Sequence, residues 1–196
     1  MRRLLMAILL SGLFYPVAAG AESPPTSIID GKVISQIREV LARPVVTISV
    51  QAQNRYYGQL SADDIDKLDK QWRSERESDD QPLIGAVMSS PLSTYLTLVQ
   101  AQSQGLYSEV FVMDRNGLNV GQGAVTSDFW QGDEAKFQKS FGVGPDAVFI
   151  DEPEFNDEFK TWRAQVNLTI VHDGEKIGAA TFEINLTELA RRQAAQ

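Results

Sequence analysis

EVFVMDRNGLNVGQG, residues 109–123, is the stretch of sequence that decides the fold. On both sides of Asn116-Gly117 apolar and polar residues alternate, and a period of two predicts β-strands. An Asn-Gly pair between two such segments is a strong hairpin signal, because these residues accept the positive φ angles of a tight turn. The stretch therefore predicts two antiparallel strands, the first of which begins at Tyr107.

Three further strands are predicted downstream of this hairpin. Asp173-Gly174 supplies a second two-residue turn, which joins the last two strands. The segments are DAVFID (146–151), TWRAQVNLTIV (161–171) and KIGAATFEI (176–184).

The second turn also implies a register for the last two strands. If Asp173-Gly174 is the loop, Ile170 faces Ile177 and Val166 faces Thr181. Each face of the hairpin then carries both apolar and polar side chains, unlike a sheet with one side in water. We therefore expect both faces to be covered and part of one face to border a polar cavity. A β-bulge would shift this register.

Upstream of Leu106 the sequence predicts helices. Segment 43–59 is ambiguous, because its β-branched residues alternate like a strand, whereas Pro44 suits a helix start; we favour a helix. Ser61 and Ser90 are expected helix caps, and the first helix is expected to begin at Thr26 or Ser27. The predicted helical segments are 26–42, 43–59, 60–75 and 89–105, with a short helix from Thr187 at the end of the chain.

Helices followed by antiparallel strands predict a single α+β domain. Residues 22–105 form its helical part and residues 106–196 its sheet part. Residues 1–21 have the basic start, apolar run and Ala-Gly-Ala ending of a secretory signal peptide. We expect cleavage and a periplasmic mature protein without a membrane span; the alternative is retention of the leader as an anchor.

The charge and the cysteine content of the chain exclude some classes of function. The chain has a net charge of −8, and loss of Arg2 and Arg3 with the leader would make it more negative. Such a surface repels phosphate backbones, so no nucleic-acid partner is expected. Cysteine is absent, which excludes disulfides and thiol catalysis.

The sequence also offers little to a catalytic site. Its only histidine, His172, lies at the predicted second turn without clustered partners. The acidic segment DEPEFNDE (151–158) could bind calcium, but it lacks the ligand spacing of a calcium loop and fits a solvated loop better. We expect no enzymatic activity, catalytic residue, metal or cofactor.

TSDFWQGDEAKFQKSF (126–141) lies between the second and third predicted strands and is the candidate for a ligand site. A pocket needs aromatic walls and a few polar groups that fix the ligand. Phe129 and Trp130 could supply walls, and Gln131 and Lys136 could supply hydrogen bonds and charge. The alternative is that the aromatic residues belong to the core, while Asp128 or Asp133 caps a helix.

Residues 109–123, followed by this insert, by GPDAVFID and by a final hairpin, resemble the extracellular PAS-like sensor domains called PDC or Cache domains. The resemblance covers about residues 26–190. It implies a five-stranded antiparallel sheet with a long N-terminal helix along one side. The ligand pocket would lie on the other side, walled by the insert.

The resemblance also implies ligands and site residues. Small organic acids and amino acids are the usual ligands, bound without covalent chemistry. The insert would contribute Asp128, Phe129, Trp130 and Gln131 to the pocket. Asp151 would end the third strand, and Arg163 or Gln165 would project from the fourth.

One departure from the family concerns signalling. Most such domains lie between two membrane helices, whereas no second membrane segment follows Leu186 before the chain ends at Gln196. We therefore expect a free domain that passes its ligand state to a membrane receptor or kinase partner. A homodimer through the N-terminal helix is a further assembly to test. The alternative is a protein-interaction module that keeps the fold and binds no ligand.

Overall fold

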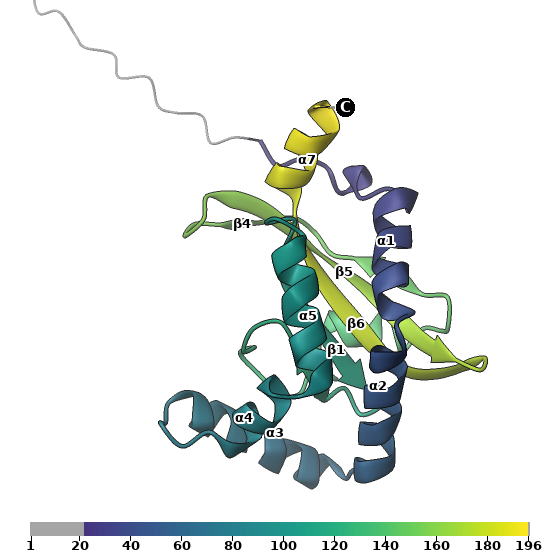
Figure 1. Ribbon diagram of the computed structural model, residues 1–196, viewed down its shortest axis with the longest axis vertical. Helices are drawn as coiled ribbons and strands as arrows, with labels where there is room; N and C mark the ends of the chain where they lie inside the picture. The colour runs from purple at the N-terminus through teal and green to yellow at the C-terminus, as the bar shows by residue number, and fades with distance from the viewer. Residues whose placement is uncertain (1–21, 196) are drawn as a thin grey trace, which may run out of the picture.

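Two hairpins determine the order of the sheet. The computed structural model describes residues 22–195, so the leader expected at residues 1–21 lies outside the described part. The sheet is antiparallel in the order β2-β1-β6-β5-β3, with β4 pairing with β5 beside β3 (Figure 1). The strands are β1 (Tyr107–Asp114), β2 (Asn119–Gln122), β3 (Val148–Ile150), β4 (Glu154–Asn156), β5 (Thr161–His172) and β6 (Glu175–Asn185).

This architecture confirms the expected α+β fold with its five-stranded antiparallel sheet. The short strand β4 is an addition that the sequence did not predict, because its acidic segment reads as a solvated loop. In the structure Phe155 lies opposite Trp162 of β5, and their ring centroids are 5.2 Å apart. Aromatic cross-strand packing therefore holds a segment whose charges alone indicate a loop.

The first hairpin closes through a longer loop than expected. Only Gly117 has a positive φ, of 81°, whereas Asn116 does not. The buried carboxylate of Asp114 accepts hydrogen bonds from the backbone N–H groups of Asn116 (2.8 Å) and Leu118 (3.0 Å). This carboxylate therefore shapes the turn, and the pairing of β1 with β2 shifts by one residue beyond Val112. At the second turn Asp173 and Gly174 both have positive φ, as predicted.

A bulge in the second hairpin overturns the expected register. Val171 pairs with Lys176, but the register shifts between Ile170 and Val171, so that Ile170 pairs with Gly178 and Val166 with Phe182. Each β5 residue before the bulge therefore pairs with a β6 residue one position later than expected. As a result, every β6 side chain lies with the opposite set of β5 side chains from the one expected. The first face is consequently apolar, because Ala164, Val166, Leu168 and Ile170 lie with apolar residues of β6. The second face remains mixed: Arg163, Gln165, Asn167 and Thr169 share it with the apolar cluster of Phe111, Met113 and Ala179.

The predicted helices are present, with one corrected start. The first helix begins after Asp30, whose carboxylate accepts from the N–H groups of Lys32 and Val33, rather than at Thr26 or Ser27, which form a short 3-10 turn. The ambiguous segment 43–59 contains a helix. The helices are α1 (Gly31–Leu41), α2 (Pro44–Tyr57), α3 (Ala62–Arg76), α4 (Pro82–Met88), α5 (Pro91–Gln102), α6 (Ala135–Gln138) and α7 (Leu186–Ala194).

Helices α1, α2 and α5 lie across the apolar face of the sheet, whereas α3 and α4 extend beyond its end (Figure 1). The main core therefore forms between α1, α2, α5 and the sheet. A second core forms around Trp72 of α3 and Phe129 of the insert, whose rings stack at 5.2 Å.

Among residues 22–195, no single helix is long and apolar enough to cross a bilayer. The pair α4–α5 has the required length and composition only when taken together, and it is bent by 63°.

Candidate functional site

The polar face of the sheet borders a cavity of about 250 Å³ beneath the insert that joins β2 to β3. The strands β5 and β6 form its floor, α6 covers it, and the segment around β4 forms its rim. The lining comprises Glu134, Ala135, Lys136, Asp151, Glu152, Glu154, Arg163, Ala164, Gln165 and Glu183.

The register of three strands determines the floor. Glu109 of β1 lies directly opposite Glu183 of β6, which in turn lies opposite Gln165 of β5. Opposed residues of antiparallel strands share a face, so these three side chains form one polar row. Arg163, two residues from Gln165 on the same face, donates from Nη1 to Glu183 at 3.0 Å. Ser108 also donates to this carboxylate.

The insert contributes one cation to the cavity. The Lys136 ammonium donates to Glu134 Oε2 at 3.0 Å and to Gln131 Oε1 at 3.2 Å. It also lies 5.4 Å from the ring centroid of Phe111, so a cation–π contact holds it over the sheet. Gln131 is buried and donates to the carbonyl of Asp128. The lysine is therefore positioned by several groups at once.

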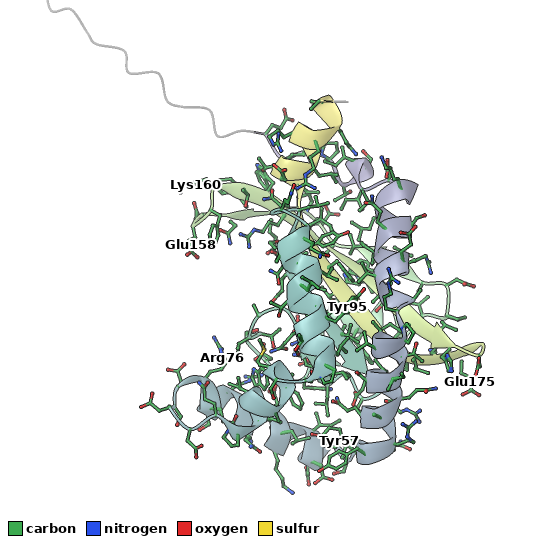
Figure 2. The ribbon with its side chains drawn as sticks, in the orientation of Figure 1. Tyr57, Arg76, Tyr95, Glu158, Lys160 and Glu175 are labelled. Carbon is green, nitrogen blue, oxygen red and sulfur yellow. The ribbon has the colours of Figure 1, made fainter. Side chains whose placement is uncertain are left out.

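The rim is acidic and more exposed. The Asp151 N–H donates to the Gln165 carbonyl at 2.9 Å, which places this carboxylate at the end of β3 beside the floor. Glu152 and Glu154 follow at the surface. Beyond them, Glu158 and Lys160 lie at the outer end of the β4–β5 connection, away from the sheet (Figure 2). Phe159 lies 5.1 Å from the Arg163 guanidinium and shields it from that side.

Carboxylates outnumber cations in this region, and this excess of negative charge affects the pKa of Glu109. Its burial raises the pKa of its carboxyl, and the neighbouring charge of Glu183 raises it further. Lys136 and Arg163 act in the opposite direction, and Glu134 again raises the pKa. Beside Glu183 of the floor, and just outside the residues that line the cavity, there is therefore a carboxyl group that resists ionisation until a cation approaches.

The structure brings together four of the eight residues predicted for the site. Lys136, Asp151, Arg163 and Gln165 line the cavity, and Gln131 lies behind Lys136.

The three remaining predicted residues, Asp128, Phe129 and Trp130, lie outside this lining. Asp128 forms an ion pair with Arg73 at 3.0 Å, Phe129 stacks on Trp72, and Trp130 packs against the same second core. They join the insert to α3, as the core alternative expected. The capping alternative is wrong, because residue 134 is the N-cap of α6 and no side chain caps it by a hydrogen bond.

Sequence reasoning missed the acidic part of the site. Glu183 was hidden because the assumed register placed it on the face opposite Arg163 and Gln165. Glu109 was hidden because the pairing of β1 with β6 was not predicted. Glu152 and Glu154 lie in the segment predicted as a solvated loop, and Glu134 reads as an ordinary helix-start residue. The alternation within TWRAQVNL, in which polar residues occupy every second position, is the signal that marks the floor.

The single histidine lies elsewhere. His172 ends β5, its side chain is 40% exposed, and its Nε2 is 3.3 Å from an Asp173 carboxylate oxygen. No group of acidic, histidine or cysteine side chains suited to a metal ion occurs within residues 22–195.

The sheet with its covering helices on one face and a roofed polar cavity on the other defines a PAS-like α+β domain. No family model matches the sequence, and no curated protein matches it. Solved structures do resemble it, among them ligand-binding domains of chemoreceptors and a sensor domain.

Three of these structures illustrate the likeness. The ligand-binding domain of the Campylobacter jejuni chemoreceptor Tlp3, in complex with 4-methylisoleucine, has a TM-score of 0.40 and 12% identity, over 85% of this chain and 64% of that one. The Pseudomonas aeruginosa PAO1 amino-acid chemoreceptor PctC, in complex with GABA, has a TM-score of 0.42 and 15% identity, over 82% and 62%. The Escherichia coli DcuS sensor domain has a TM-score of 0.40 and 16% identity, over 66% and 96%.

The chain thus spans less than two thirds of the two chemoreceptor domains. Likeness at these identities concerns the fold.

Proposed function

We propose that this protein is a periplasmic sensor domain that binds a small polar metabolite without covalent chemistry and passes its ligand state to a membrane receptor or kinase. The observation that carries the proposal is the cavity on the polar face of the sheet. The insert covers one side of it, and charged groups of both signs converge on it from four separate segments. Convergent polar groups in a hollow are typical of small-ligand sites.

The size of the cavity favours a small ligand. Its volume of about 250 Å³ lies just below the range of roughly 300–1,000 Å³ for ligand pockets. An amino acid, a short amine or a short organic acid suits this space. Lys136, Asp151, Arg163 and Gln165 are the side chains that we expect to contact it. No catalytic step is part of the proposal.

A thermal-shift screen of amino acids, organic acids and amines tests this function, because a ligand that binds only the folded state raises its melting temperature. A variant that fills the cavity, Ala135→Phe, should abolish every shift. Ala194→Phe, at the exposed end of α7, is the matched control and should respond as the unmodified protein does. Absence of a shift with every compound, together with an empty cavity in a crystal structure, would refute the proposal.

One observation favours the alternative of an interaction module without a ligand. Both cations of the cavity are already paired with lining carboxylates, Lys136 with Glu134 and Arg163 with Glu183. A site whose two cations are both satisfied internally has no free positive charge to attract an acidic ligand. The screen separates the two functions, because an interaction module shows no small-molecule shift and binds a protein partner equally well with Ala135→Phe.

A further inference from the structure

The charge of the cavity is strongly unbalanced, and this imbalance selects among ligand classes. Each of the two cations already has a carboxylate partner at 3.0 Å, Lys136 with Glu134 and Arg163 with Glu183. Within residues 22–195, no cationic side chain lies within 4.0 Å of the rim carboxylates of Asp151, Glu152 and Glu154. The cavity therefore has negative charge to spare and no spare positive charge.

The floor adds to this imbalance. Glu109 lies directly opposite Glu183 in the sheet, and like charges directly opposed across two strands destabilise their pairing. In the described part of the chain, Glu109 forms no ion pair, while Glu183 is shared between Arg163 and Ser108. The charged groups that face Glu109 are Glu183 of β6, Arg163 of β5, and Glu134 and Lys136 of the insert.

A carboxylate ligand is a poor match for this arrangement. To bind, it would have to displace Glu134 from Lys136 or Glu183 from Arg163, and each displaced carboxylate would remain close by. An ammonium group instead brings three donors and a positive charge to carboxylates that lack a cation. The cavity suits a cation at its floor and a second cation at its rim.

On the basis of the proposed function, we propose that the ligand is a small aliphatic diamine, with one ammonium beside Glu183 on the floor, next to the neighbouring Glu109, and the other beside the Asp151 rim. Glu109 and Glu183 act as specificity-determining residues. They attract the ammonium and exclude ligands that end in a carboxylate. Lys136 and Arg163 keep their internal partners and position the carboxylates.

Binding of a diamine should be linked to the protonation of Glu109. Without ligand, burial and the charge of Glu183 hold the pKa of Glu109 above its ordinary value. An ammonium beside it favours the ionised form and therefore promotes release of a proton. Affinity should consequently fall as the pH is lowered through the pKa that Glu109 has in the free protein.

Three compounds with the same four-carbon chain test the ligand class by titration calorimetry. 1,4-Diaminobutane carries two ammonium groups, 4-aminobutanoate one ammonium and one carboxylate, and butanedioate two carboxylates. We expect the diamine to bind at least about tenfold more tightly than 4-aminobutanoate, and butanedioate to bind most weakly, because each ammonium gains a charge-assisted hydrogen bond.

Matched variants test the residues. Glu183→Gln and Glu109→Gln should each weaken diamine binding by about ten- to a hundredfold, the effect of losing one charged partner. Glu158→Gln removes the same charge at the outer end of the β4–β5 connection and should leave the affinity unchanged (Figure 2). Glu109→Gln should also remove the pH dependence of binding. The melting temperature of Glu109→Gln checks that this variant folds. It should not fall, because the substitution removes the repulsion between Glu109 and Glu183.

The outcomes separate this inference from the proposed function. Tighter binding of butanedioate or 4-aminobutanoate than of the diamine would overturn the ligand class and leave the sensor function intact. So would a screen in which only compounds without amines bind. Equal weakening by Glu158→Gln would assign the effect to general surface charge and refute the role of the floor. If no compound binds in either the series or the screen, both proposals fail.

Discussion

The indole N–H of Trp130 donates a hydrogen bond of 2.9 Å to the backbone carbonyl of Asn116. It ties the insert to the β1–β2 turn, and the Gln131 N–H reinforces the tie by donating to the Gly117 carbonyl at 2.8 Å. Glycine is needed at position 117 because a Cβ there would lie 2.7 Å from the Cα of Gly132. Trp130 thus ties the insert to the turn at the end of the sheet, whereas the residues of the insert that line the cavity are Glu134, Ala135 and Lys136.

Replacement of Trp130 tests this anchoring role. Trp130→Phe keeps an aromatic ring but removes the donor, so we expect a loss of about 1 kcal/mol in the free energy of unfolding, as for a typical hydrogen bond. Urea denaturation measures the loss. Ligand-induced thermal shifts should persist at their original size. A loss of ligand response with unchanged stability would instead place Trp130 in the ligand site.

Asp69 provides a second anchor for the insert. One of its carboxylate oxygens accepts from the backbone N–H groups of both Phe129 (2.9 Å) and Trp130 (3.0 Å), and the other pairs with Arg73 at 2.7 Å. Asp69→Ala leaves two N–H groups without their acceptor and should destabilise the protein by about 2–4 kcal/mol. Asp69→Asn keeps one acceptor oxygen and should cost less. Equal losses for the two variants would show that the ion pair with Arg73 is the main contribution.

Asn54 links α2 to both hairpins. Its amide donates to the Ile177 carbonyl at 2.7 Å and its oxygen accepts from the Arg115 N–H at 3.0 Å, in a site where the side chain is only 4% exposed. Asn54→Ala should lower the free energy of unfolding by roughly 2–3 kcal/mol, because two buried backbone groups lose their partners. Asn54→Asp retains the acceptor but not the donor. A cost for Asn54→Ala below that of an average surface substitution would contradict this role.

Glu109 should make stability depend on pH. Because the pKa of this carboxyl is raised in the folded protein above its ordinary value of 4.5, the folded state binds the proton more tightly than the unfolded state. Stability therefore declines as the pH rises from about 4.5 through the folded pKa. Glu109→Gln lacks this decline.

The two proteins should have equal urea midpoints below pH 4.5, and the variant should be more stable at pH 7. A variant that is less stable at pH 7 would show that the ionised carboxylate is stabilised by Lys136 and Arg163 more than burial penalises it. Asp114, whose pKa is also raised by burial, remains in both proteins and cancels in the comparison.

Local patterns in the sequence were sufficient for most elements of the fold, but not for α4 or β4. The first strand was predicted from its alternation, and the helix at Pro44–Tyr57 from its proline and apolar face, against a competing β-branched pattern. Both signals lie within a few residues, where steric and hydrogen-bond preferences act directly. Helix α4 was missed because it is short and its charged neighbours resemble a loop.

The candidate site was predictable only in part. Lys136 could be proposed from the composition of the insert, and Asp151, Arg163 and Gln165 from a resemblance, but Glu109 and Glu183 could not. They lie side by side through the pairing of β1 with β6, which no local pattern predicts. The bulge between Ile170 and Val171 then places Glu183 on the face of Arg163 and Gln165, because a shift of one residue reverses the face of every side chain beyond it. No feature of the sequence marks the bulge.

The sequence alone determined an α+β domain with two hairpins, because strand periodicity, turn residues and helix caps are properties of neighbouring residues. Only the tertiary structure decided which way the insert faces. The Asp69 carboxylate and the Phe129 N–H, which meet at 2.9 Å, are 60 residues apart, and their contact commits the aromatic half of the insert to the core. Because Phe129 and Trp130 are packed in the second core, the charged part of the insert around Lys136 lies over the polar face of the sheet. The physical reason is that burial and charge pairing depend on residues distant in the chain, which no local pattern records.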